Sequence, residues 1–90
     1  MTIWKFPIEI IDEVLIDMPR GAVILSIQTQ GTMPCILALV DPEQPKCKRL
    51  ILTRRTGQHI DFSGIPFVGT YQFHNGTLIF HVFDGGEKLN

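Results

Sequence analysis

The sequence predicts an all-β domain of about seven short, mostly antiparallel strands, arranged as a small sandwich or a partly open barrel. Apolar and polar residues alternate along most of the chain, and turn-forming residues interrupt this alternation about every ten residues. No segment sustains the period of an amphipathic helix. Residues 8–18 come closest, through Ile8, Ile11, Leu15 and Met18, and a short helical turn there is the alternative to a strand.

The clearest element is a C-terminal hairpin built from two β-prone runs, 65–74 and 77–84, around Asn75-Gly76. This dipeptide tolerates the positive φ angles of a two-residue type I′ turn. The turn predicts three cross-strand pairs: His74 with Thr77, Gln72 with Ile79, and Thr70 with His81. Because side chains alternate along a strand, one face should enter the core. That face carries Phe67, Gly69, Tyr71, Phe73, Leu78, Phe80 and Val82.

The remaining strands follow in order, each bounded by proline, glycine or polar residues. They are predicted at 2–10, 13–18, 22–28, 34–40 and 48–54, with a loop at 56–64 and a frayed polar tail at 85–90. Pro7 cannot donate to a ladder, so the first strand is expected at an edge or at a bulge. Residues 34–40 are apolar on both faces, which is typical of a central strand or of a strand with one face in an interface.

Size and composition predict a single domain over residues 1–90. The chain is 44% hydrophobic and 19% charged, which is more apolar surface than so small a domain hides easily. We therefore expect a homo-oligomer, the alternative being a monomer with an apolar binding face.

Cys35 lies in an apolar run and should be buried, whereas the neighbouring lysines should lower the pKa of an exposed Cys47. Two cysteines and no signal peptide favour reduced thiols in a cytoplasm, and no apolar run approaches the ~20 residues of a membrane helix.

Charged residues are segregated along the chain, although the net charge is only −1. Acidic residues dominate the front of the chain, at Glu9, Asp12, Glu13 and Asp17. Basic residues dominate its middle, at Lys46, Lys48, Arg49, Arg54 and Arg55. These segments are candidate partner-binding surfaces, either complementary within a dimer or facing an outside partner. The alternative is that both are solvated strand faces that keep sheet edges from aggregating.

No catalytic constellation is recognisable, so we expect no enzyme and no cofactor. Ser63 and Cys47 have no base spaced to activate them, and the carboxylates cluster in one exposed-looking strand. In the predicted register His74 and His81 are about 13 Å apart, too far to share a metal ion. One segment has the composition of an anion-binding site, because guanidinium groups, a hydroxyl and a glycine amide suit an anion. It consists of Arg54, Arg55, Thr56, Gly57 and His59. Trp4 and Tyr71 could stack bases beside the basic strand, but both are predicted in cores, so nucleic-acid binding is not expected.

Several motifs resemble a family of small uncharacterised proteins, a domain of unknown function, from tailed-phage genomes and prophages. They lie at 3–6, 18–22, 24–28, 34–35, 38–42, 56–57, 68–70 and 80–83, and so cover nearly the whole chain. The chain departs from the family at Ile36-Leu37, where an aromatic residue is usual, and at Arg55-Thr-Gly-Gln-His59, where the family has Gly-Thr-Gly-His. The resemblance implies the cytoplasm of an infected or lysogenic bacterium, and it transfers no catalytic residue.

These observations lead to an expected function and two alternatives. We expect a non-enzymatic phage accessory protein that binds and blocks a host macromolecule, such as an anti-defence inhibitor of the anti-CRISPR kind. One alternative is a sponge that binds a phosphorylated small-molecule signal through the Arg54–His59 segment. The other is a minor virion or assembly component.

Overall fold

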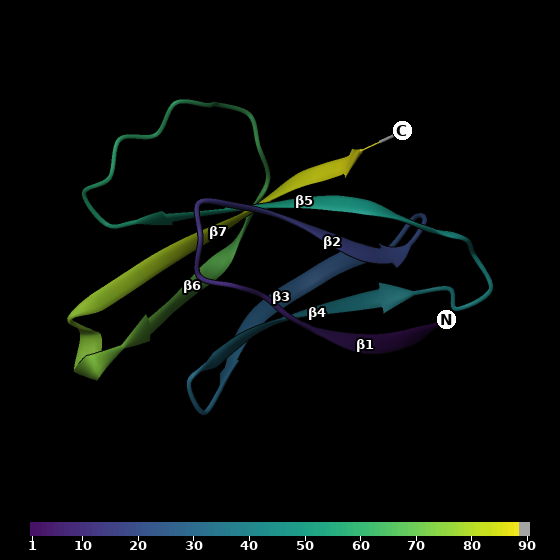
Figure 1. Ribbon diagram of the computed structural model, residues 1–90, viewed down its shortest axis with the longest axis horizontal. Helices are drawn as coiled ribbons and strands as arrows, with labels where there is room; N and C mark the ends of the chain where they lie inside the picture. Colours follow the sequence, from purple (N-terminus) through teal and green to yellow (C-terminus); the bar gives the residue numbers. More distant parts are fainter. Residues whose placement is uncertain (89–90) are drawn as a thin grey trace.

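The computed structural model describes residues 1–88 and contains seven strands in two antiparallel sheets (Figure 1). This confirms the predicted all-β class. The strands form two separate sheets and do not close into a barrel. The elements are β1 (Thr2–Pro7), β2 (Glu13–Pro19), β3 (Val23–Gln30), β4 (Met33–Val40), β5 (Lys46–Arg55), β6 (Phe67–Phe73), the single 3₁₀ turn η1 (His74–Gly76) and β7 (Leu78–Lys88). No helix within residues 1–88 is long and apolar enough to cross a membrane.

The smaller sheet has the strand order β1-β4-β3, so the doubly apolar β4 is central, as its sequence predicts. Ile36, Ala38 and Val40 alternate toward the core and are fully buried. β1 lies at an edge, as Pro7 requires. The predicted first strand is too long, because the chain leaves the sheet after Pro7 and residues 8–12 form a connection to β2. No helical turn forms over 8–18.

The larger sheet has the strand order β2-β5-β7-β6 and contains the predicted hairpin. Gln72 pairs with Ile79 and Thr70 with His81, which confirms the predicted register. Asn75 and Gly76 have positive φ angles of 55° and 87°, and the Thr77 N–H donates to the His74 carbonyl at 3.1 Å. His74 also has a positive φ of 53°, so the strands end one residue earlier than predicted, at Phe73 and Leu78.

Replacing Gly76 with valine should lower the free energy of unfolding by ~1 kcal/mol or more. A Cβ atom strains a residue at φ 87°, a β-branched residue suits this conformation worst, and the new atom would lie 3.0 Å from the Gln72 side-chain oxygen. Thermal or urea unfolding measures the change. Gly31→Val is the matched control for the contact with Gln72. Gly31 also has a positive φ, so valine is strained there too, but an added Cβ meets nothing within 4 Å. Equal stability of Gly76→Val and wild type would contradict the turn conformation.

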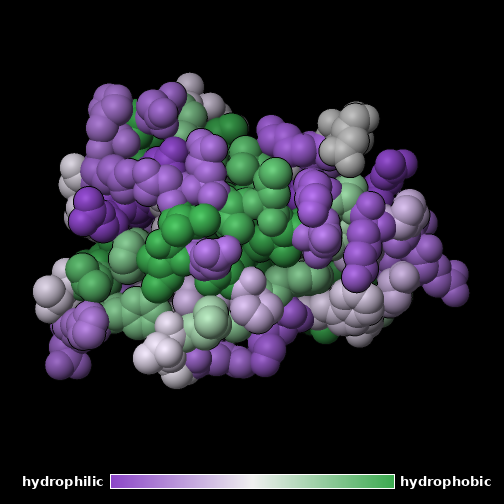
Figure 2. All heavy atoms as spheres, viewed as in Figure 1, coloured by the Kyte–Doolittle hydropathy of each residue, from purple (hydrophilic) through white to green (hydrophobic). Residues whose placement is uncertain are grey.

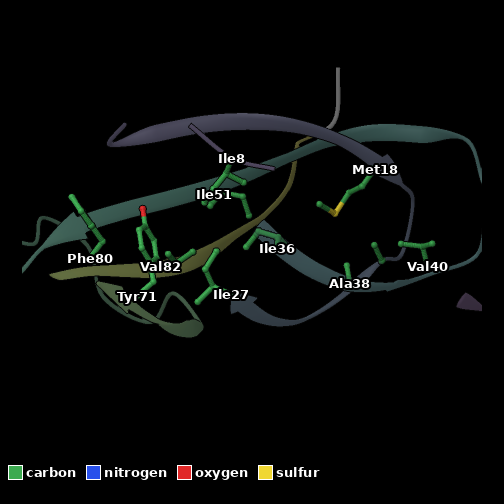
Figure 3. Close-up of a cluster of buried hydrophobic side chains, with 11 residues drawn as sticks. Ile8, Met18, Ile27, Ile36, Ala38, Val40, Ile51, Tyr71, Phe80 and Val82 are labelled. Carbon is green, nitrogen blue, oxygen red and sulfur yellow. The ribbon is translucent and has the colours of Figure 1, made fainter. Parts of the chain in front are cut away.

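The core fills the space between the two sheets (Figure 3). Ile27, Ile36 and Ala38 approach from the smaller sheet, and Ile51 and Val82 approach from the larger one. Ile8 lies in the same cluster, at the start of the connection that links the sheets. β3 and β6, one edge strand of each sheet, lie in contact, so β1 and β2 are the remaining edge strands.

Three residues predicted in the core are exposed instead, namely Phe67, Trp4 and Leu78, the last at 37% beside the hairpin turn. Phe67 is 59% exposed, because an irregularity between Phe67 and Gly69 shifts its pairing to Phe83 and removes it from the core face. Its ring packs edge-on against Phe83, whose other neighbour is Phe62 of the loop 56–66. Trp4 remains more than one-third exposed on β1, an edge strand of the smaller sheet.

The predicted frayed tail is wrong for residues 85–88. β7 continues to Lys88, past a bulge at which Gly86 has a φ of 86° and Gly85 packs against Leu50. Residues 89–90 of the predicted tail lie outside the described residues. The sequence did not reveal this extension because two consecutive glycines usually mark a strand end.

Candidate functional site

Arg49, one of the predicted partner-binding residues, is buried in an ion pair inside the protein. Its Nε and Nη2 atoms donate to the two carboxylate oxygens of Asp84 at 2.9 and 2.7 Å, and its Nη1 donates to the Ala22 carbonyl at 2.8 Å. This pairing lowers the pKa of Asp84 and raises that of Arg49. Arg49 therefore joins β5, β7 and the β2–β3 turn, and its guanidinium is not presented to a partner.

Cys47 lies beside Glu87, and this overturns the predicted effect of the neighbouring lysines. The Cys47 thiol donates to Glu87 Oε2 at 2.8 Å, and the Gly21 N–H donates to the same oxygen at 2.9 Å. The hydrogen bond to a carboxylate raises the pKa of Cys47 and lowers that of Glu87. Cys35 is buried, as its apolar run predicts, and both thiols are free.

Replacing Glu87 with glutamine should make Cys47 several-fold more reactive toward iodoacetamide near pH 8. The change removes the negative charge that stabilises the thiol over the thiolate, so more thiolate is present at that pH. Mass spectrometry of the alkylated protein measures the rate, and the buried Cys35 serves as an internal control. Glu43→Gln, in the exposed β4–β5 turn, should leave the rate unchanged. Equal rates for wild type and Glu87→Gln would contradict the contact.

Arg54 of the predicted anion site is also buried. Its Nη1 donates to the Asp12 carbonyl at 2.7 Å and to the Thr53 carbonyl at 3.0 Å, and its guanidinium lies 5.3 Å from the centre of the Phe62 ring. Asp61 is an exposed partner at 3.5 Å. Arg54 thus fastens the loop 56–66 and the connection 8–12 to the sheet.

The other predicted anion-binding residues are only partly brought together. Arg55 and Thr56 line a hollow of about 290 Å³ with Thr77, Leu78 and Ile79. Gly57 lies in the turn closed by the Gln58 N–H and the Arg55 carbonyl, while His59 is exposed farther along the loop. The Thr56 hydroxyl is 2.7 Å from Nε2 of His81, whose Nδ1 is 2.9 Å from the Thr70 hydroxyl.

The acidic and basic segments are neighbours within one sheet, because β2 pairs with β5. Asp17 lies opposite Lys48 and forms an ion pair with it at 2.8 Å. Asp12 accepts a hydrogen bond from the Gln58 amide at 3.1 Å. Some of the acidic and basic residues predicted to face a partner therefore pair with each other within the same chain. Glu9 and Glu13 are exposed and form no ion pair within residues 1–88.

Exposed aliphatic side chains lie between these acids. Ile10 and Ile11 in the connection are 43% and 45% exposed, and Leu15 on β2 is 52% exposed. Figure 2 shows hydrophobic residues gathered where Figure 1 places β2 and the connection leading into it. We call this region the acidic–apolar surface, and it consists of Glu9, Ile10, Ile11, Asp12, Glu13, Leu15 and Asp17.

The acidic–apolar surface is hollowed on both sides of the connection. Ile11, Val14 and Leu15 line a hollow of about 560 Å³ with Leu50, Glu13 and Lys88. Ile10 lines a second one, of about 480 Å³, over Phe73, Leu78 and Phe80. Apolar hollows with charged borders resemble the anatomy of protein interfaces, in which apolar anchors are surrounded by a polar rim.

Sequence reasoning identified the acids of this surface but not its aliphatic residues. The sequence pattern predicts Ile10 in the first strand and places Ile11 only on the alternative helical face. The strand pattern puts Leu15 on the face of Glu13 and Asp17, but nothing local shows that the three aliphatic residues form one exposed surface. The available signal was the adjacent pair Ile10-Ile11, since neighbouring residues of a strand cannot both point into one core.

Comparisons with known proteins give a family without a function. No curated protein and no solved structure matches the chain. The sequence profile of a domain of unknown function, DUF7352, matches residues 1–89, which is nearly the entire chain. The predicted membership of an uncharacterised family is thereby confirmed, while the link to phages stays a prediction. The chain belongs to the DUF7352 family of domains of unknown function.

Proposed function

We propose that this protein is a non-enzymatic protein-binding domain and that its interface is the acidic–apolar surface. The observation that carries the proposal is the exposure of Ile10, Ile11 and Leu15 between acidic residues and beside two apolar hollows. Burying aliphatic surface supplies affinity, and a charged rim selects partners of opposite charge. The partner should therefore present apolar anchors among lysine or arginine residues.

The placement of the other charged groups supports this choice of surface. Arg49 and Arg54 hold the fold together from inside, and Lys48 is paired with Asp17. Glu9 and Glu13 are free to face a partner. Negative groups at an interface raise the rate of association with a basic partner, and salt weakens this effect.

In its narrower form, the proposal follows the resemblance to phage proteins. The partner is then a basic, nucleic-acid-binding component of a bacterial defence system, and the acidic–apolar surface blocks it stoichiometrically. A small stable domain without a catalytic constellation suits this kind of inhibition. The acids of residues 9–17 would compete with nucleic acid for the basic groove of the target.

A site-specific photo-crosslinker tests the interface directly. Benzoylphenylalanine at position 11 should give one discrete protein adduct in bacteria that carry a defined defence system, and at position 67 it should not. Phe67 is the comparison position because it is exposed and lies on β6, the edge of the larger sheet opposite β2. Identical adduct patterns at both positions, or no adduct at position 11, would refute the interface.

Phage plating tests the narrower form. Expression of the wild-type protein should restore plating on a host with the defence system, and Ile11→Asp should abolish the effect while Val23→Asp, on the smaller sheet, retains it. If wild type never changes plating on such hosts while the crosslink at position 11 still forms, the domain binds a protein of another kind. Mass spectrometry of purified virions then shows whether that protein is a virion component.

A second candidate function is the binding of a phosphorylated small molecule near Arg55. The hollow lined by Arg55, Thr56 and Thr77 offers a guanidinium and two hydroxyls, which suit a phosphate. Calorimetry against cyclic nucleotides tests it. Arg55→Ala should remove any binding, and binding that Arg55→Ala leaves unchanged would exclude this hollow.

A further inference from the structure

We propose that β2 is a docking edge, at which an extended segment of the partner adds to the larger sheet as a fifth strand. The inference rests on the proposed function and specifies how the acidic–apolar surface is used. β2 ends the strand order β2-β5-β7-β6, so one of its sides has no neighbouring strand among residues 1–88. Adding a strand to an exposed sheet edge is a recurrent mode of peptide recognition.

The hydrogen bonds at the two ends of β2 reveal which backbone groups face outward. The Thr53 N–H donates to the Asp12 carbonyl at 3.0 Å, and the Arg20 N–H donates to the Pro45 carbonyl at 2.8 Å. Both pairs continue the register of β2 with β5. In an antiparallel ladder, inward and outward backbone groups alternate residue by residue. The even-numbered residues from 12 to 20 therefore bond to β5, and Glu13, Leu15 and Asp17 direct their N–H and C=O groups away from it.

The outward groups of Glu13, Leu15 and Asp17 form a continuous pairing edge. It ends at Pro19, because proline has no N–H and the Pro19 carbonyl already accepts from the Ala22 N–H at 3.2 Å. None of the three residues is a proline, and no backbone hydrogen bond of theirs to another part of residues 1–88 occurs outside the strand pairing. Unpaired N–H and C=O groups along a strand act as a template for another chain. β2 thus offers three donors and three acceptors at the spacing that an added strand requires.

The other free edge, β1, is less suited to pairing. The Ile8 N–H donates to the Pro34 carbonyl at 3.0 Å and continues the register of β1 with β4, so Ile3, Lys5 and Pro7 face outward there. Pro7 has no N–H to donate, and lysine and proline are residues with which proteins protect sheet edges. β1 thus offers two consecutive outward residues with an N–H, Ile3 and Lys5, whereas β2 offers three, so β2 is the longer open edge.

The side chains of β2 define the chemistry of the added strand. Glu13, Leu15 and Asp17 point to the exposed face, while Val14 and Ile16 pack against the core from its border. Residues directly opposite one another share a face of the sheet. The added strand should therefore place lysine or arginine beside Glu13 on the exposed face and apolar residues beside Val14 and Ile16. Its sequence signature is an alternation of basic and apolar residues.

A second copy of β2 fits this edge poorly. An antiparallel pair centred on Leu15 would place Glu13 of each copy opposite Asp17 of the other, and directly opposed like charges destabilise a sheet. A basic strand meets the same carboxylates with opposite charge. The occupant is therefore a basic–apolar segment of a different protein.

The test uses an acetylated and amidated peptide of the length of β2 that alternates lysine and valine. Titrated into the isotope-labelled full-length protein, it should shift the amide resonances of Glu13, Leu15 and Asp17, and a glutamate–valine peptide should not. Leu15→Pro removes an outward N–H but no hydrogen bond to β5, so the fold should persist. Its affinity for the lysine–valine peptide should fall about tenfold, which corresponds to the loss of about one hydrogen bond. Leu15→Val keeps that N–H and should bind within about twofold of wild type.

The outcomes separate this inference from the proposed function. Equal binding by Leu15→Pro and Leu15→Val, or no binding of the lysine–valine peptide to wild type, would overturn strand addition. If a specific crosslink at position 11 still formed, the acidic–apolar surface would remain an interface of another geometry. Should Leu15→Pro fail to fold, a lysine–valine peptide methylated on alternate backbone nitrogens replaces it. Undiminished binding of that peptide would equally contradict pairing.

Discussion

Replacing Phe80 with alanine should lower the free energy of unfolding by about 3–5 kcal/mol. Phe80 is buried on the core face of β7, where its ring stacks on Tyr71 at 5.2 Å between centroids and contacts Phe73 at 6.5 Å. The strands on both sides hold these neighbours in place, so they cannot collapse into the space left behind. Urea unfolding followed by circular dichroism measures the loss.

His81→Thr is the control for Phe80→Ala, because His81 is adjacent in the chain and points to the opposite face. It is half-buried, and its contacts are two hydroxyl groups, those of Thr56 and Thr70. Losing these exposed hydrogen bonds should cost less than the core cavity. A larger loss for His81→Thr than for Phe80→Ala would mean that the faces of β7 are assigned the wrong way round.

Replacing Arg49 with methionine should cost about 3–5 kcal/mol at neutral pH. The change leaves the Asp84 carboxylate partly buried without its two guanidinium hydrogen bonds, and it also removes the donor to the Ala22 carbonyl. Lys48→Met is the matched control. Its ion pair with Asp17 is about half exposed, so its loss should cost at most about 1 kcal/mol.

The pH dependence distinguishes an electrostatic loss from a packing loss. Arg49 holds the pKa of Asp84 below its ordinary value, so this contribution to stability is complete above about pH 4 and is lost as the pH falls through the lower folded pKa. In Arg49→Met, burial favours the protonated carboxyl. The stability difference between the two proteins should therefore shrink as the pH falls below about 4. A difference that stays constant as the pH falls from neutral to well below about 4 would contradict the ion pair.

Local rules predicted the fold class and the hairpin register. The hairpin was predictable because Asn75-Gly76 fixes the turn and residues 69–73 alternate without interruption. Phe67 was misassigned because the irregularity at Val68 depends on pairing with β7, which no local pattern records. The same holds for the end of β7, where a bulge opposite β5 accommodates Gly85 and Gly86. A bulge depends on the pairing with the partner strand, so it cannot be predicted from the sequence of one strand alone.

The candidate site was predictable in its charges but not in its geometry. The acids of residues 9–17 stand out in the sequence, yet their neighbourhood with β5 follows only from strand order. Arg49 and Arg54 looked like surface cations because burial of arginine requires partners distant in the chain, here Asp84 and the Asp12 carbonyl. The raised pKa of Cys47 likewise depends on Glu87, 40 residues away, and not on the adjacent lysines.

Amide hydrogen exchange along β2 in the free protein tests the central claim, that this strand presents an open pairing edge. The ladder with β5 predicts slow exchange at Val14, Ile16 and Met18 and fast exchange at Glu13, Leu15 and Asp17, since only the first set is hydrogen-bonded within the protein. Two-dimensional NMR of the isotope-labelled protein resolves these amides individually. An alternating pattern, independent of protein concentration, is the predicted result. Slow exchange at all six amides would show that the β2 edge is already covered and would contradict the account.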